Sequence, residues 1–144
     1  MKTLQIGIFA FLLSANLFAQ TIAYHSTNGV AIKGYDPVAY FSEQKATEGK
    51  KEFKYEWSGT QWLFSSQANL DTFKADPQKY APQYGGFCAY GVSENHKSPT
   101  DPNAWTVTDG KLYLNYSLKV KELWSKDIPT RIQKANGFWP SLNQ

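Results

Sequence analysis

The sequence has little cysteine, histidine or net charge. It contains one cysteine, Cys88, and two histidines, His25 and His96, among 144 residues. A single cysteine leaves no partner for a disulfide within the chain. The formal net charge is only +3, and its lysines are interspersed with acidic residues, which is too weak a basic patch to indicate a nucleic-acid-binding surface. We therefore expect no nucleic-acid partner.

Long apolar runs are also scarce, and the one that stands out lies near the N-terminus. Lys2 precedes an apolar run at residues 6–13, and Leu17-Phe18-Ala19 places a small residue at a cleavage position. This pattern predicts a secretory signal peptide at residues 1–19, with cleavage after Ala23 as an alternative. A membrane anchor is less well supported because the run is shorter than the ~18 residues that a membrane-spanning helix needs. We expect a periplasmic or secreted protein without a membrane span after signal removal.

An unpaired cysteine is unusual in an exported protein, where cysteines generally form disulfides. Cys88 could be an inert buried thiol, a metal ligand, a nucleophile or a link to another chain. His96 follows eight residues later across a polar loop, so the two side chains could meet. Thiolate and imidazole together suit copper or zinc, although the spacing matches no compact ligand motif. His96 is also the nearest candidate base for a nucleophilic cysteine, and His25 lies in the N-terminal lead-in.

Aromatic residues, by contrast, are abundant: 5 Trp, 9 Tyr and 9 Phe. Each buries a large area, so most of them are expected to build the core of a small domain. The others could line a ligand pocket near Cys88. We take Tyr35, Tyr84 and Tyr90 as the candidate ligand-binding residues.

The order of local signals predicts one small α+β domain over residues 31–142, preceded by a flexible lead-in at residues 20–30. Alternating aromatic and charged residues predict one β-hairpin around Gly59, and Asp109-Gly110 predicts a second. Several short helices should follow capping or helix-initiating residues. The last helix is expected to end at Asn136-Gly137. The predicted helix starts lie at or just after Asp36, Ser66, Pro77, Ser117 and Asp127.

Several motifs resemble those of the exported bacterial YHS-domain proteins. The resemblance covers about residues 32–139 and rests on Gly34-Tyr35-Asp36-Pro37-Val38-Ala39-Tyr40-Phe41, Trp62-Leu63-Phe64-Ser65-Ser66, Asp76-Pro77-Gln78-Lys79-Tyr80, Tyr84-Gly85-Gly86-Phe87-Cys88-Ala89 and Asp109-Gly110-Lys111-Leu112-Tyr113-Leu114-Asn115-Tyr116.

This resemblance implies a metal-binding scaffold whose usual ligands are missing. Related domains, found beside copper-transporting ATPases and in some monooxygenases, hold a metal through cysteines in Asp-Pro-Val-Cys and Phe-Cys-Ser-x-x-Cys elements. Here those positions carry Ala39, Ser65 and Asn69. The metal site of those relatives therefore cannot be transferred to this chain, and Cys88 belongs to a separate element typical of the exported form.

We expect an exported, non-catalytic binding module with Cys88 and His96 as candidate metal ligands and copper or zinc as the metal. No catalytic residue is assigned. One alternative is a thiol-dependent enzyme or redox protein that uses Cys88. The other is a structural or partner-binding domain in which the thiol is inert, and the sequence does not identify its protein partner.

Overall fold

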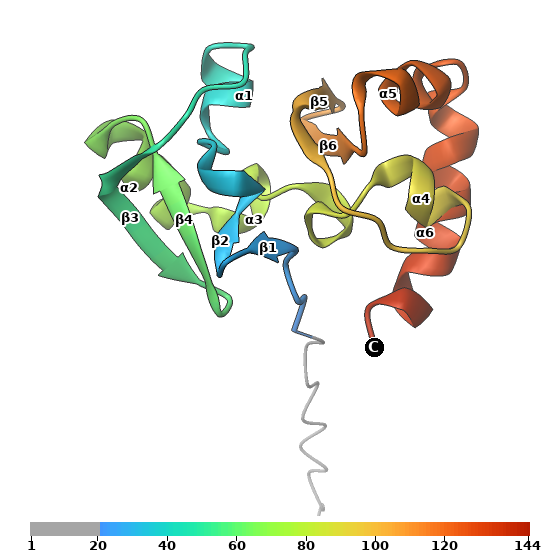
Figure 1. Cartoon of the computed structure of the whole chain (residues 1–144), viewed down its shortest axis with the longest axis horizontal. Helices are drawn as coiled ribbons and strands as arrows, with labels where there is room; N and C mark the ends of the chain where they lie inside the picture. The colour runs from blue at the N-terminus through green and yellow to red at the C-terminus, as the bar shows by residue number, and fades with distance from the viewer. Residues whose placement is uncertain (1–20) are drawn as a thin grey trace, which may run out of the picture.

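A computed structural model describes residues 21–144, so the predicted signal peptide lies outside the described residues. The described chain contains two small sheets and six α-helices, which confirms the predicted α+β class. Figure 1 shows the elements up to α3 gathered in one half of the molecule and β5, β6 and α4–α6 in the other. The first half holds β1 (Ser26–Thr27), β2 (Val30–Ala31), α1 (Ala39–Ser42), β3 (Lys50–Trp57), β4 (Thr60–Phe64), α2 (Gln67–Ala75) and α3 (Pro77–Tyr80). The second half holds α4 (Ala89–Ser93), β5 (Asp101–Thr108), β6 (Lys111–Asn115), α5 (Leu118–Ser125) and α6 (Ile128–Leu142).

Both predicted hairpins are present. β3 and β4 pair antiparallel in a four-stranded sheet of order β1-β2-β4-β3, in which β2 runs parallel to β4. β5 and β6 form the second sheet and are joined at Asp109 and Gly110, which both have positive φ angles. Such angles are required in the tight turns that match the twist of a hairpin, and the Asp-Gly pair tolerates them well.

The strand β6 joins the two halves because both of its faces are buried. Leu112 and Leu114 pack into the core of the first half with Tyr40, Trp62 and other aromatic residues. Tyr113, between them on the opposite face, packs into the core of the second half. The period-two alternation of a strand thus lets one short element serve two hydrophobic clusters.

The first half is organised around Asp36, whose side chain is fully buried. Its Oδ1 accepts hydrogen bonds from the backbone N–H groups of Val38 at 2.8 Å and Ala39 at 3.3 Å, at the start of α1. Its Oδ2 accepts from the Ser65 N–H at 2.8 Å, the Ser65 hydroxyl at 2.7 Å and the Asn69 amide at 2.7 Å. A buried carboxylate is costly unless it is fully hydrogen-bonded, and here five donors meet that need. The carboxylate links α1, the end of β4 and α2.

The lead-in differs from the flexible segment that was expected. Tyr24 packs against the rings of Trp57 and Trp62, each at 5.2 Å between centroids. The backbone N–H of His25 donates to the Gly85 carbonyl at 2.7 Å. The folded unit therefore begins before residue 31. Burial of the Tyr24 ring stabilises the ordered position of this segment, which polar residues alone would not do.

The last helix does not end at Asn136-Gly137 as expected, and α6 continues to Leu142. Trp139 and Leu142 pack against the second core cluster, and the Trp139 ring lies 5.9 Å from that of Tyr84. Burial of these side chains outweighs the roughly 1 kcal/mol that glycine costs inside a helix. Helix propensity is overridden here by tertiary packing.

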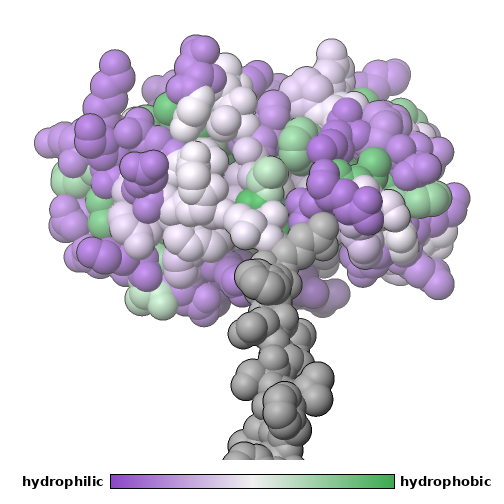
Figure 2. Space-filling view, turned by 90° about the horizontal axis from the view of Figure 1, so that it is seen from below, coloured by the Kyte–Doolittle hydropathy of each residue, from purple (hydrophilic) through white to green (hydrophobic). Residues whose placement is uncertain are grey.

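The exterior is mostly polar on the face seen in Figure 2, where apolar residues are scattered among hydrophilic ones. Within residues 21–144, no helix combines the length and apolar character that crossing a bilayer would require.

We predict that Gly137→Ala stabilises the protein by about 0.5–1 kcal/mol, because alanine is a better helix former than glycine. A Cβ at this position meets no heavy atom within 4 Å, so it creates no clash. Thermal or denaturant unfolding would measure the change. Destabilisation would instead indicate that the helix ends at this glycine, as the sequence pattern suggested.

We also predict that Asp36→Asn destabilises the fold by about 3 kcal/mol or more. In the wild type both carboxylate oxygens accept hydrogen bonds, so in either orientation of the asparagine amide its NH₂ group would face other donors. Asp71→Asn is the matched control: Asp71 is exposed and accepts one hydrogen bond from Gln67, so its change should stay within about 0.5 kcal/mol. Urea denaturation of the two variants compares them directly. Equal stabilities would refute the organising role of Asp36.

Candidate functional site

Cys88 lies directly before α4 and acts as its N-terminal cap. Its Sγ accepts hydrogen bonds from the backbone N–H groups of Gly91 at 3.4 Å and Tyr116 at 3.2 Å. The residue is only 2% exposed. Two backbone N–H groups, from α4 and from the residue after β6, thus hold the sulfur in place.

Asn115, at the end of β6, supplies the acceptor for the Cys88 thiol. The Sγ lies 3.5 Å from Asn115 Oδ1, which also accepts the backbone N–H of Tyr90 at 3.0 Å. Asn115 is fully buried, and its Nδ2 has no hydrogen-bond partner within the described part of the chain. The Asn115 amide oxygen therefore accepts a hydrogen bond from the thiol. The N–H groups of Gly91 and Tyr116 can donate to the sulfur whether it is a thiol or a thiolate.

A short loop brings His96 back to α4. The loop is fixed by three hydrogen bonds: the His96 N–H to the Gly91 carbonyl at 3.0 Å, the Cys88 N–H to the Ser98 carbonyl at 3.0 Å, and the Thr100 hydroxyl to the Gly86 carbonyl at 2.9 Å. These bonds place the His96 ring beside Gly91. A Cβ on Gly91 would lie 3.3 Å from His96 Nε2 and 3.3 Å from the His96 carbonyl, so the close approach depends on glycine.

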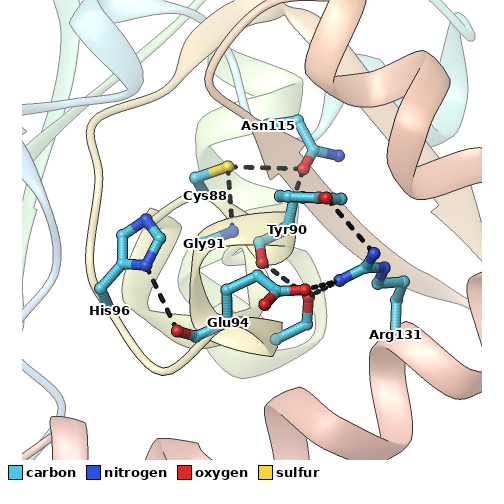
Figure 3. Close-up of polar contacts among 8 residues, drawn as sticks. Cys88, Tyr90, Gly91, Glu94, His96, Asn115 and Arg131 are labelled. Atoms are coloured by element: carbon cyan, nitrogen blue, oxygen red, sulfur yellow. Dashed lines mark hydrogen bonds and ion pairs between the residues drawn. The ribbon is translucent and has the colours of Figure 1, made fainter.

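The hydrogen bonding of His96 defines which ring nitrogen is available. Its Nδ1 lies 3.4 Å from the Glu94 carbonyl oxygen. A carbonyl only accepts, so this contact requires a proton on Nδ1, and in the neutral imidazole the lone pair is then on Nε2. His96 is exposed, and Figure 3 shows its ring and the Cys88 Sγ flanking Gly91.

Cys88 and His96 line the same cavity, which has a volume of about 260 Å³. Tyr90, Gly91, Ser98, Tyr116 and Val120 complete its lining. Tyr116 is 56% exposed and Leu118, two residues later, is 62% exposed. The cavity thus combines one sulfur and one imidazole nitrogen with largely apolar surroundings.

Arg131 fixes the opposite side of α4 (Figure 3). Its guanidinium lies over the Tyr90 ring, 4.1 Å from the centroid, and donates to the Tyr90 hydroxyl, the Ser93 hydroxyl and the Glu94 carboxylate. The hydrogen bond from Arg131 lowers the pKa of Glu94 below its usual value. These contacts tie α4 to α6 and hold the helix that carries the cavity.

The predicted site residues are distributed over several places. Cys88, His96 and Tyr90 share the cavity. Tyr84 lines a different cavity, and Tyr35 packs against the core of the first half. The His25 ring packs against that of Phe87 at 5.0 Å between centroids and 43° between planes, outside the Cys88 cavity. Burial, and secondarily the charge of Lys33, lowers the pKa of His25.

Sequence reasoning missed Asn115, Tyr116 and Gly91. Asn115 and Tyr116 lie far from Cys88 along the chain, and only the packing of β6 against α4 brings them together. A polar asparagine at the end of an otherwise apolar strand was the one available indication. Gly91 carried no indication, because its role comes from the fold of the following loop.

The positions that hold metal in the relatives implied by the resemblance do not fit a metal here. Ser65 and Asn69 both donate to the Asp36 carboxylate, and their own side chains lie 3.3 Å apart, Asn69 Nδ2 to Ser65 Oγ. Ala39 offers no ligand atom. Over residues 21–144 there is also no group of three or more His, Cys, Asp or Glu side chains that could hold a metal ion.

Comparison with known proteins identifies one segment. No curated protein and no solved structure matches the chain. The matching family model is described as the YHS domain and covers residues 38–84, which lie in the half of the molecule organised by Asp36 and end before Cys88. The segment at residues 38–84 is therefore similar to the YHS-domain family.

Proposed function

We propose that the protein is an exported, non-catalytic binding module that holds Cu(I) between Cys88 Sγ and His96 Nε2. The observation that carries the proposal is that the chain's single thiol and an available imidazole nitrogen line one cavity. A soft thiolate paired with imidazole is a donor set that suits copper. The YHS segment lies outside this cavity, so the proposal rests on the geometry around Cys88.

The number of donors favours Cu(I) over Zn(II). Structural zinc sites use four protein ligands and catalytic ones three. No cluster of three such side chains occurs in the described residues, and the cavity offers two. Cu(I) is stable with two soft or borderline donors, so it fits the pair better.

The surroundings of both donors suit metal binding. The Nδ1 contact with the Glu94 carbonyl orients the His96 ring, the arrangement generally found behind metal-ligating histidines. The N–H groups of Gly91 and Tyr116 would stabilise the Cys88 thiolate. When bound, Cu(I) would supply a soft acid centre to this pair. The thiol proton, now directed at Asn115 Oδ1, would be released on binding.

The same two N–H groups also favour a second function, that of a reactive thiol, with His96 Nε2 as the base. Metal binding and reactivity need the same thiolate but differ in the role of His96. A ligand must remain bound to the metal, whereas a base only accepts the thiol proton. The experiments below separate the two.

We predict that Cys88→Ser and His96→Gln each weaken Cu(I) binding by at least about tenfold, roughly 1.4 kcal/mol, because each removes one of two donors. Competition with a coloured Cu(I) chelator under reducing conditions measures the affinity. His25→Gln is the matched control, since the other histidine lies outside the cavity and its loss should leave affinity unchanged. Equal affinities of wild type and Cys88→Ser would overturn the proposal.

We further predict that Gly91→Ala weakens Cu(I) binding although both donors remain. The added methyl group would stand 3.3 Å from His96 Nε2 and displace the ring, whereas alanine favours the helix itself. The affinity and the unfolding midpoint should be measured together: lower affinity with unchanged stability is expected. Unchanged Cu(I) affinity of Gly91→Ala would show that His96 is not a ligand. In that case the alkylation rate of Cys88 should be compared between the wild type and His96→Gln. Faster alkylation in the wild type would support the reactive-thiol alternative.

A further inference from the structure

A second cavity, separate from the one at Cys88, lies where the entering chain, the segment after α3 and helix α6 meet. Its volume is about 350 Å³. It shares no lining residue with the Cys88 cavity. Its lining includes three carboxamides and three aromatic rings: Gln78, Gln83, Asn136, Tyr24, Tyr84 and Trp139.

The lining carries no charge. Among residues 21–144, no lysine, arginine, histidine, aspartate or glutamate contributes to it. Its ionisable groups are tyrosines, and burial raises the pKa of Tyr24 to about 12 and that of Tyr84 above its usual value. The cavity therefore stays neutral throughout the physiological pH range. An ionic ligand would lose hydration there without gaining a partner of opposite charge.

The carboxamides provide hydrogen bonds in both directions. The Tyr84 hydroxyl donates to Asn136 Oδ1 at 2.9 Å, which orients that amide and leaves its NH₂ group as a donor. Within residues 21–144, the side chains of Gln78 and Gln83 make no hydrogen bond to the protein. Each therefore has one acceptor and two donor N–H groups to offer.

An aromatic wall completes the cavity. The Trp139 ring meets that of Tyr84 at 67° and 5.9 Å between centroids, so the two rings meet edge to face and leave the indole only partly covered. Gly85, with a φ angle of +60°, lies between this ring and the entering chain. A Cβ there would be 3.0 Å from the Ala23 carbonyl, so the entering chain can approach this close only because residue 85 is glycine.

We propose that this cavity binds a neutral, polyhydroxylated ring, that is, an uncharged saccharide unit. Vicinal hydroxyl groups both donate and accept, which matches the carboxamides of Gln78, Gln83 and Asn136. The apolar C–H face of a pyranose stacks on an indole such as Trp139. The size falls at the lower end of small-molecule sites, which suits one or two sugar units. The inference is independent of Cu(I) binding.

The test is titration of the purified protein with glucose, N-acetylglucosamine and N,N′-diacetylchitobiose, followed by NMR chemical shifts and tryptophan fluorescence. Glucose 6-phosphate and glucuronate are the charged counterparts. At least one neutral sugar should bind, with an affinity that is unchanged by salt and by pH between about 5 and 9, because the raised tyrosine pKa values leave nothing to titrate. The charged counterparts should bind at least about tenfold more weakly.

Variants locate the site. Gln78→Leu and Gln83→Leu keep the side-chain size and remove the amide, and each should weaken sugar binding by at least about tenfold. Gln44→Leu is the matched control because Gln44 lines a different cavity, with Trp105. Unchanged circular dichroism spectra and unfolding midpoints of all three variants would confirm their fold without reference to the sugar. Failure of every neutral sugar to bind, equal affinity of the glutamine variants, or stronger binding of the charged sugars would overturn the inference.

Discussion

The buried carboxylate of Asp36 is the constraint on which the first half of the molecule depends. Five hydrogen bonds from three segments converge on its two oxygens, and none of the cationic side chains in the described part of the chain hydrogen-bonds to it. Because every donor around it would lose its partner if the carboxylate moved, α1, the end of β4 and α2 are fixed relative to one another. The aromatic residues of that core then pack against a frame that is already defined.

This network also explains why the YHS segment of this chain is unsuited to a metal. A cation there would need free lone pairs, yet the Asp36 oxygens are engaged and the nearby Ser65 and Asn69 act as donors toward them. Asp36, Ser65 and Asn69 thus hold α1, the end of β4 and α2 together without an ion. Soft-metal chemistry in the described chain requires a sulfur, and Cys88 lies in the other half, joined to the first by the doubly buried strand β6.

The sequence predicted those features that depend on neighbouring residues. Ser66 and Ser117 cap α2 and α5 through their own hydroxyls, and Asp109-Gly110 turns the second hairpin, as expected. The length of α6 was not predictable, because its continuation past Gly137 comes from packing of Trp139 against residues about fifty positions earlier. Likewise Cys88 and His96 could be named as candidates, but Asn115 and Tyr116 enter the site only through tertiary contacts.

The placement of Cys88 determines what kind of chemistry it can perform. The sulfur receives two backbone N–H groups and lines a cavity that also holds the exposed His96 imidazole. The Cys88 sulfur caps α4, and the loop that returns His96 to Gly91 is held by two backbone hydrogen bonds and by the buried Thr100 hydroxyl. Arg131 in turn holds α4 to α6. The Cys88 cavity and the Asp36 network therefore lie in different halves of the molecule, which the strand β6 joins.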